Sequence, residues 1–412
     1  MRRHTIAPRA NWQRAVERVG LTYHTLDNGT PYWDESAYWE FSAAEIDRLE
    51  AATAEIQRMA LAAGDAILDP ASDWLSRMHI PAKAVAAIRE TWQSEPPALY
   101  GRLDLAYDGH SIKLVEYNAD TPTCLVEAAV AQWYWLEELF PKADQFNSLH
   151  EKLVAKWRDL FPYVSQPVYF GHDGGNHGGG NEDAMTIAYL RDTAQQAGLK
   201  TAAIAMRDIG WEEAKKHLLG AATPGRFVDL GGHPIQTIFK LYPWEWLLND
   251  AFGDRALETL NSKDQKPVAG KVQWLEPAWK MLWSNKALLA VLWEMFPNHE
   301  LLLPAYLDGP HNMQNYVRKP LVGREGAGVA VFRNWAESDY AADKGAAASS
   351  LDAKAADGHF VYQQLARMAE ADGKTAVFGS WLIDGEPAGM GIRESDGLVT
   401  NNFSRFVPHL FR

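Results

Sequence analysis

This sequence has a single cysteine, relatively few positive charges and no long apolar run. As the single cysteine, Cys124 cannot form an internal disulfide. Because a low cysteine content is typical of proteins in a reducing compartment, we expect a cytoplasmic protein. The 40 lysines and arginines are outnumbered by 53 aspartates and glutamates, and the net charge of −13 argues against nucleic acid or an anionic membrane as a partner. No apolar run approaches membrane-spanning length, and residues 1–30 lack the apolar core of a signal peptide.

The chain is instead rich in aromatic residues and long enough for more than one core. Its 17 tryptophans and 15 tyrosines are expected mainly in the core or in pocket walls, because so much exposed aromatic surface would favour aggregation. For 412 residues we expect two or three subdomains.

Residues 100–123 predict a β-hairpin that gathers polar groups on one face, since strand side chains alternate with a period of two. A three-residue turn at 108–110 would place Arg102 opposite Glu116. One face then carries the polar side chains of Arg102, Asp104, Glu116 and Asn118. The other face carries Leu103, Leu105 and Val115. The polar set suits a hard cation beside a phosphate; a solvated face with an Arg–Glu pair is the alternative.

Helices and strands are expected along the rest of the chain. Helices are predicted over 42–68, 81–93, 125–140, 147–157, 182–197 and 287–296. Strands are predicted over 167–170, 200–206, 226–230, 235–241, 313–322, 329–332, 360–364, 375–383 and 388–394. Residues 1–40 read as irregular. The unit 167–206 predicts a parallel sheet, whereas 226–241 predicts another hairpin.

A loop over 171–181 contains several glycines and histidines. It matches neither the dinucleotide-binding glycine pattern nor the P-loop pattern. His172, Asp173 and His177 could bind a metal, but a fourth ligand at the usual spacing is missing, so we expect a mobile loop near the substrate.

A second glycine-rich loop, 323–328, follows a strand that ends in Lys319. Its glycines could allow backbone N–H groups to approach phosphates, or could simply form the tip of a hairpin. Lys286, before a predicted helix, could anchor a phosphate or be a solvated lysine. Residues 336–357 are rich in alanine, serine and aspartate and are expected to form a surface insertion.

Six motifs occur together in a fixed order. They are R-L-D at 102–104, E-Y-N-A-D-T-P-T at 116–123, K-L-Y-P-W-E at 240–245, S-N-K at 284–286, K-P-L-V-G-R-E-G at 319–326 and G-I-R at 391–393. Through these motifs the chain resembles the glutathionylspermidine synthetase family, especially stand-alone members without an amidase domain. The resemblance extends over nearly the whole chain. The resemblance implies an α+β fold of the ATP-grasp type, with antiparallel β lobes that clamp ATP and a small parallel α/β subdomain.

The resemblance also implies an activity and assigns roles to single positions. It implies an ATP-dependent ligase that joins a small-molecule or peptide carboxylate to an amine through an acyl phosphate, with two Mg²⁺ ions. Catalytic arginines are implied at Arg102 and Arg393. Metal ligands are implied at Asp104, Glu116 and Asn118. ATP contacts are implied at Arg102, Asp104, Lys286, Lys319, Gly326, Gln363, Leu398, Val399 and Thr400. Substrate contacts are implied at Thr121, Glu182 and Asp183.

On this basis four segments are expected. Residues 1–98 form an aromatic-rich and helical N-terminal segment, and 99–165 form the metal-binding hairpin with its helices. Residues 166–275 form an α/β subdomain on the substrate side, and 276–412 form the ATP-grasp lobe with a glycine-rich lid.

Two positions depart from the family pattern. Leu241 stands where the synthetases carry a threonine that contacts glutathione, and Arg405 stands where an acidic amine contact is expected. Leucine forms no hydrogen bond, so we expect glutathione and spermidine to be a poor pair unless both residues pack elsewhere. Two other functions stay open: an ATP-grasp kinase or ATPase that does not ligate an amine, and a non-catalytic nucleotide-binding module.

Overall fold

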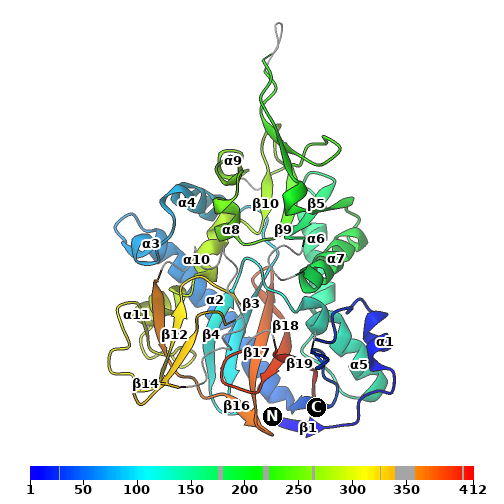
Figure 1. Ribbon diagram of the computed structural model, residues 1–412, viewed down its shortest axis with the longest axis vertical. Helices are drawn as coiled ribbons and strands as arrows, with labels where there is room; N and C mark the ends of the chain where they lie inside the picture. Colours follow the sequence, from blue (N-terminus) through cyan, green and yellow to red (C-terminus); the bar gives the residue numbers. More distant parts are fainter. Residues whose placement is uncertain are drawn as a thin grey trace.

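The fold is described here from a computed structural model of the chain (Figure 1). The structure describes residues 1–26, 28–174, 180–216, 222–261, 265–324, 326–338, 358–400 and 403–412. Within these ranges the chain forms helices and five separate sheets, and the two termini lie at the same end of the molecule (Figure 1). No helix in the described part is long and apolar enough to span a membrane.

The central sheet joins strands from distant parts of the sequence. Its order is β19-β18-β17-β3-β4, with β16 paired to β17, and every pairing is antiparallel. The strands are β3 (Tyr100–Tyr107), β4 (Ile112–Asn118), β16 (Ala369–Ala371), β17 (Lys374–Ile383), β18 (Glu386–Ser395) and β19 (Arg405–Val407). The sheet therefore brings the motifs at 102–104, 116–123 and 391–393 together.

The predicted hairpin of β3 and β4 forms, but its register differs from the expected one. The turn has four residues, 108–111, and not three. The register that this turn sets would by itself place Glu116 on the face opposite Asp104. A β-bulge at Val115 adds one residue to β4 and restores the shared face. The pairs are Tyr107 with Ile112 and Leu105 with Leu114 before the bulge, then Asp104 with Glu116 and Arg102 with Asn118. The shared polar face is confirmed, but the predicted pairing of Arg102 with Glu116 is wrong.

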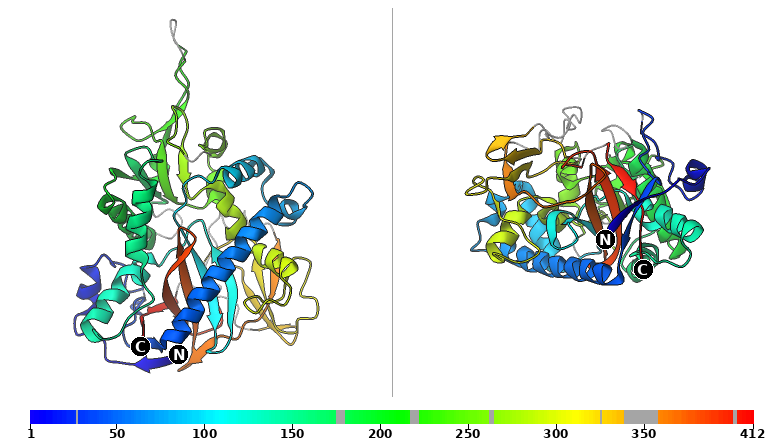
Figure 2. Two further views of the ribbon diagram at one scale, coloured as in Figure 1. Left: turned by 180° about the vertical axis from the view of Figure 1, so that it is seen from behind. Right: turned by 90° about the horizontal axis from the view of Figure 1, so that it is seen from below.

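One long helix covers the rear of the central sheet. Helix α2 (Ala43–Leu68) runs diagonally behind it (Figure 2), and its predicted start is confirmed by a capping box between Ser42 and Glu45. Its apolar face, including Leu49, Ile56 and Met59, is fully buried. The other helices are α1 (Trp12–Glu17), α3 (Trp74–Arg77), α4 (Val85–Ser94), α5 (Gln132–Leu139), α6 (Leu149–Leu160), α7 (Gly180–Gln196), α8 (Trp244–Asn249), α9 (Gly253–Glu258), α10 (Met281–Ser284) and α11 (Leu288–Met295).

The predicted parallel sheet is confirmed, and it takes in one strand that was expected elsewhere. Its order is β10-β9-β5-β6, and all pairings are parallel. The strands are β5 (Val168–His172), β6 (Thr201–Ala205), β9 (Thr237–Leu241) and β10 (Gln273–Leu275). The hairpin predicted over 226–241 forms only at its turn, where Val228 bridges Pro234 in antiparallel fashion. Beyond the turn, β8 (Arg226–Val228) pairs with β7 (Gly210–Glu212) and β9 joins the parallel sheet. Every residue of β9 is buried, as a central parallel strand requires.

Two further antiparallel or mixed sheets complete the fold. One has the order β11-β15-β12-β13-β14 and contains the predicted strand–glycine loop–strand. Its strands are β11 (Ala305–Tyr306), β12 (Tyr316–Pro320), β13 (Ala330–Arg333), β14 (Ala336–Glu337) and β15 (Phe360–Gln364). The other has the order β1-β2-β20, with β1 (Arg2–Thr5), β2 (Ala37–Phe41) and β20 (His409–Phe411). Residues 1–40 are therefore not irregular throughout. Most of the predicted insertion over 336–357, from 339 on, lies outside the described residues.

Candidate functional site

Two adjoining cavities lie over the polar face of β3 and β4. The first, which we call the apolar cleft, has a volume of about 840 Å³ including its mouth; the second, the polar cleft, has about 890 Å³. The apolar cleft has walls formed by Val115, Val317, Pro320, Leu365, Ala366, Met368, Val377, Leu398 and Val399. Both cavities are lined by Asp104, Glu116, Gly323, Arg324, Gly326 and Thr400. A ligand that reached from one cavity to the other would therefore pass both carboxylates of the hairpin.

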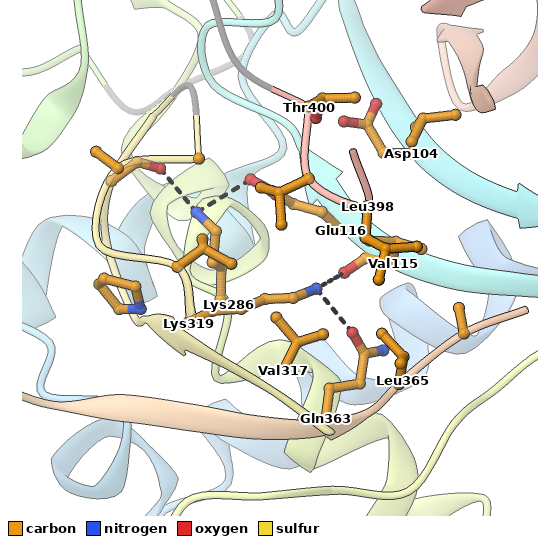
Figure 3. A pocket seen from close by; sticks show the side chains of 18 of the residues that line it. Asp104, Val115, Glu116, Lys286, Val317, Lys319, Gln363, Leu365, Leu398 and Thr400 are labelled. Atoms are coloured by element: carbon orange, nitrogen blue, oxygen red, sulfur yellow. Dashed lines mark hydrogen bonds and ion pairs between the residues drawn. The ribbon is translucent and has the colours of Figure 1, made fainter. Parts of the chain in front are cut away.

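A buried lysine crosses the floor of the apolar cleft. Lys319, at the end of β12, donates to the Val115 carbonyl at 2.8 Å and to Oε1 of Gln363 at 2.7 Å (Figure 3). The Gln363 amide donates in turn to the Leu114 carbonyl at 2.9 Å, so the bulge of β4 is held by two side chains of the neighbouring sheet. Burial lowers the pKa of Lys319 to about 8; Glu116 opposes this shift and Lys286 adds to it.

A second lysine connects the hairpin to the glycine-rich loop. Lys286 precedes α11, and its Nζ lies 3.0 Å from Glu116 Oε1 and donates to the Gly323 carbonyl at 2.7 Å (Figure 3). The loop follows Pro320 and has positive φ at Gly323, Gly326 and Gly328, conformations that favour glycine. Lys286 is therefore not a solvated lysine: its side chain is 6% exposed and faces the cleft.

Two arginines converge on Asp104 in the polar cleft. Arg102 donates from Nε to Oδ1 at 2.7 Å and from Nη2 to Oδ2 at 3.2 Å, and Arg393 donates to Oδ2 at 2.8 Å. Burial raises the pKa of Asp104, but attraction by both guanidinium groups outweighs it and holds the pKa below its ordinary value. The Arg102 side chain lies along β17 over Gly379, where a Cβ would come within 3.0 Å of Arg102 Cδ.

The site carries more positive than negative charge. Four cationic side chains, Arg102, Arg393, Lys286 and Lys319, surround the two carboxylates of Asp104 and Glu116. The formal surplus is two positive charges, which suits an anionic ligand such as a polyphosphate. The carboxylate and amide oxygens of Asp104, Glu116 and Asn118 are of the type that binds Mg²⁺. If the two carboxylates bound Mg²⁺, phosphate oxygens could take their place as partners of the four cationic side chains. The donor set therefore fits a magnesium–nucleotide ligand.

Asp120 joins the two walls of the polar cleft. Its Oδ1 accepts from Lys240 at 2.6 Å and its Oδ2 accepts from the backbone N–H of Trp244 at 2.9 Å. Ser284 Oγ accepts from the backbone N–H of Asp120 at 2.9 Å. The Lys240 and Asp120 side chains are 0% and 2% exposed. This buried ion pair ties the strand that carries Glu116 to the parallel sheet and to α8.

Most of the residues predicted for the site line one of the two clefts. In the apolar cleft lie Lys286, Lys319, Gln363, Leu398 and Val399. In the polar cleft lie Arg102, Asn118, Thr121 and Arg393. Glu182 and Asp183 line neither cleft. The Glu182 carboxylate accepts from the thiol of Cys124, the residue that follows Thr123 of the polar cleft, at 3.6 Å.

The two positions that depart from the family pattern do not line the clefts either. Leu241 is 1% exposed and lies within the hydrophobic core. Arg405 has its nearest carboxylates on Asp34 and Asp396, each at 3.8 Å. Both residues therefore pack elsewhere, which is the alternative under which they do not disfavour glutathione and spermidine. Alternation along β9 directs Lys240 toward Asp120 and Leu241 away from it.

Some lining residues were not predicted as site residues. Val115 reaches the apolar cleft only through the bulge, which no sequence pattern marked. Asp120 continues the alternation of Glu116 and Asn118, and this period of two could have identified it. Arg324, Glu245 and Trp246 complete the polar cleft.

A metal site at the glycine-rich loop 171–181 is not supported by the residues described there. His177 lies outside the described residues, and the Nδ1 of His172 accepts from the backbone N–H of Gly174 at 3.1 Å. Across the described ranges no three His, Cys, Asp or Glu side chains cluster as they would around a metal ion.

Comparisons with known proteins agree with this geometry. A model of the family described as glutathionylspermidine synthase preATP-grasp matches residues 3–412. A proposed acid–amine ligase of Haemophilus influenzae is 38% identical over 424 residues, covering the full length of both chains. The trypanothione synthetase of Crithidia fasciculata is 27% identical over 80% of this chain and 49% of its own length. The bifunctional glutathionylspermidine synthetase/amidase of Escherichia coli is 24% identical over 91% of this chain and 59% of its own length.

A solved structure extends the likeness to the fold. The apo form of a glutathione synthetase-like effector from Globodera pallida has a TM-score of 0.53 over 97% of this chain and 96% of that chain, at 9% sequence identity. The family match over almost every residue confirms the resemblance drawn from the motifs. This chain therefore belongs to the glutathionylspermidine synthase preATP-grasp family.

Proposed function

We propose that this protein is an ATP- and Mg²⁺-dependent ligase of the glutathionylspermidine synthetase type, which joins a carboxylate to an amine. The family match and the relatives, which are named as an acid–amine ligase and as synthetases, support this reaction class. The observation that carries the nucleotide part is the cluster of Arg102, Arg393, Lys286 and Lys319 around two carboxylates, beside an apolar cleft.

The two clefts suggest how the ligands divide between them. An adenine ring would suit the apolar cleft, where Val317, Met368 and Leu398 supply apolar walls. The triphosphate would then extend toward Lys286 and Lys319 and reach Glu116. The polar cleft, with Thr121 and Arg393, would hold the acid beside the γ-phosphate.

In the proposed reaction a carboxylate oxygen of the acid attacks the γ-phosphorus of ATP, which releases ADP and leaves an acyl phosphate. Phosphoryl transfer requires mainly positioning and charge neutralisation, which Arg102 and Arg393 are placed to provide. Mg²⁺ held by Asp104, Glu116 and Asn118, proposed as two ions, would neutralise charge on the phosphates. The amine then attacks the acyl carbon, phosphate leaves, and an acidic side chain accepts the proton lost by the amine.

The experiment is a mass-spectrometric assay of purified protein with ATP, Mg²⁺ and a pool of small carboxylic acids and amines, with glutathione and spermidine tested separately. We expect ADP, phosphate and an amide product in equal amounts. Once the acid is known, labelling its carboxylate with ¹⁸O should place one ¹⁸O atom in the released phosphate. Glu116→Gln should lose the reaction, whereas the exposed control Glu294→Gln should keep it.

The same assay separates the two other functions. A phosphorylated acid, or ADP and phosphate without an amide, would indicate a kinase or ATPase. ATP binding without turnover under any substrate combination would indicate a nucleotide-binding module. Either outcome would contradict the proposed ligation.

A further inference from the structure

A third cavity lies behind the central sheet, and its lining shares no residue with the two clefts. Tyr117, which alternates with Glu116 and Asn118 along β4, points into it, so it opens on the opposite face from the polar cleft. We call it the rear cavity; its volume is about 1370 Å³ including its mouth. It lies between the sheet, α2 and the segment that carries Trp279 and Trp283.

Three tryptophans form one wall of the rear cavity. Trp279 and Trp283 pack edge to face with ring centroids 4.5 Å apart, and Trp92 packs edge to face against both. At the mouth, Leu61 and Tyr163 are 46% and 42% exposed, high values for apolar side chains. Flat rings packed against indoles gain both apolar burial and favourable edge-to-face contacts. The walls therefore suit a flat, apolar ring system.

One buried amide in the rear cavity has an unused donor. Gln57, on α2, is only 8% exposed, and its Oε1 accepts from the Tyr117 hydroxyl at 2.6 Å. Its Nε2 has no hydrogen-bond partner among the described residues and lies beside Gly385, where a Cβ would be 3.5 Å from it. This N–H can therefore donate to an acceptor atom of a ligand in the cavity.

The buried charges around the rear cavity are paired. Its lining contains two lysines and two carboxylates. Lys280 Nζ donates to the Tyr100 carbonyl at 2.7 Å and lies 3.1 Å from the buried Glu276, and Lys156 pairs with Asp384. The other lining carboxylate, Glu95, is exposed, where solvent screens its charge. The buried part of the cavity therefore has no unpaired charge to select an ion, which favours a neutral ligand.

We propose that the rear cavity is a second small-molecule site, for a neutral, flat aromatic or heteroaromatic compound whose acceptor oxygen or nitrogen binds the Gln57 Nε2. This site is separate from the clefts proposed for ATP, the acid and the amine. It contacts the same strand from behind, because Tyr117 lies between Glu116 and Asn118 and stacks on Trp283 at 5.2 Å. Its occupant would therefore touch a neighbour of the proposed metal ligands without entering either cleft.

The test uses coumarin, a neutral flat lactone, as the probe and naphthalene as the matched ring without an acceptor. Titration calorimetry and saturation-transfer NMR on the full chain should show saturable binding of one coumarin, two- to tenfold tighter than naphthalene. Gln57→Glu keeps the acceptor for Tyr117 but removes the N–H donor, and should remove this preference. Ala98→Phe should fill the cavity and abolish binding of both probes.

Two controls make the result specific. Phe161→Ala removes an exposed ring that lies outside the cavity lining, and should leave coumarin affinity unchanged. A saturating non-hydrolysable ATP analogue with Mg²⁺ should not displace coumarin. Displacement by the analogue, binding that survives Ala98→Phe in a protein with an unchanged melting curve, or no saturable binding up to millimolar coumarin would each overturn the second site.

Discussion

Replacing either member of the buried pair Lys240–Asp120 should destabilise the protein strongly, and replacing both should restore most of the loss. The two side chains are 0% and 2% exposed, and their charged atoms lie 2.6 Å apart. Lys240→Met would leave the buried Asp120 carboxylate with only the backbone N–H of Trp244 as a hydrogen-bond donor. Asp120→Asn would leave the buried ammonium group of Lys240 without a compensating charge. Each single change should cost about 3–5 kcal/mol, because the desolvation penalty is no longer offset.

The double variant Lys240→Met/Asp120→Asn should cost only about 1–2 kcal/mol, since replacing a whole buried pair by neutral side chains is often nearly neutral. The coupling energy of the cycle should therefore exceed about 2 kcal/mol. The exposed pair Arg58–Glu55 on α2, with side chains 60% and 33% exposed at 2.6 Å, is the matched control. Its cycle should show no measurable coupling, because solvent screens the two exposed charges.

Urea unfolding followed by tryptophan fluorescence, with hydrogen exchange to localise the change, supplies the free energies. Equal coupling energies for the buried and exposed pairs, or a Lys240→Met protein as stable as the wild type, would refute the reasoning. A double variant as unstable as the sum of the single variants would show that the two residues act independently and that Asp120 does not join the walls of the polar cleft.

The remaining predictions concern three other parts of the chain. Glu116→Ala should reduce Mg²⁺-dependent ATP turnover by on the order of a hundredfold or more in a steady-state phosphate assay, and near-normal turnover in a folded protein would rule out its metal role. The segment 319–328 should gain hydrogen-exchange protection with Mg²⁺ and ATP, because its glycines lower the cost of opening; unchanged protection would favour a plain hairpin. Burial lowers the pKa of His409 to about 3. The free energy of unfolding should therefore fall as the pH drops from about 6.5 toward 3, by up to roughly 1.4 kcal/mol per pH unit. His409→Gln should flatten this slope in urea titrations.

The pH effect follows from the surroundings of His409. Its Nδ1 lies 2.9 Å from Gln132 Oε1, and the Gln132 amide donates to two carbonyls, so Nδ1 is the donor. Nε2 is buried without a partner among the described residues, and protonation there would place a charge in the core. A pH profile unchanged by His409→Gln would contradict this account.

Local patterns predicted much of the fold, and long-range pairing accounts for what they missed. The start of the helix predicted over 42–68 and the alternation in β3 and β4 depend on neighbouring residues, and both predictions are confirmed. Strand β9 was assigned to a hairpin because it follows β8 closely, but its partner β5 lies far earlier in the sequence. Pairing between distant strands depends on tertiary packing, which no local pattern encodes.

The candidate site shows the same division. The spacing of Arg102 and Asp104 within β3 was sufficient to predict that these two share a face, whereas Glu116 joins that face only through the bulge in β4. The contact of Lys319 with the Val115 carbonyl depends on the bulge and on a second sheet, and the burial of Leu241 depends on which face of β9 meets the core. The motifs thus indicated which residues gather around the two clefts, whereas the three-dimensional packing decided which of them line the clefts.

Because of the bulge at Val115, the length of the 108–111 turn and the set of side chains that face the clefts depend on each other. The turn alone sets the strands one residue out of phase, and the extra residue in β4 corrects the phase just before Glu116. A relative whose turn is one residue shorter or longer could keep its carboxylates facing the same cleft only without this bulge. In alignments of relatives, a single-residue gap in the turn should therefore be accompanied by a second gap near position 115. Grafts of this hairpin into other scaffolds must carry the turn and the bulge together.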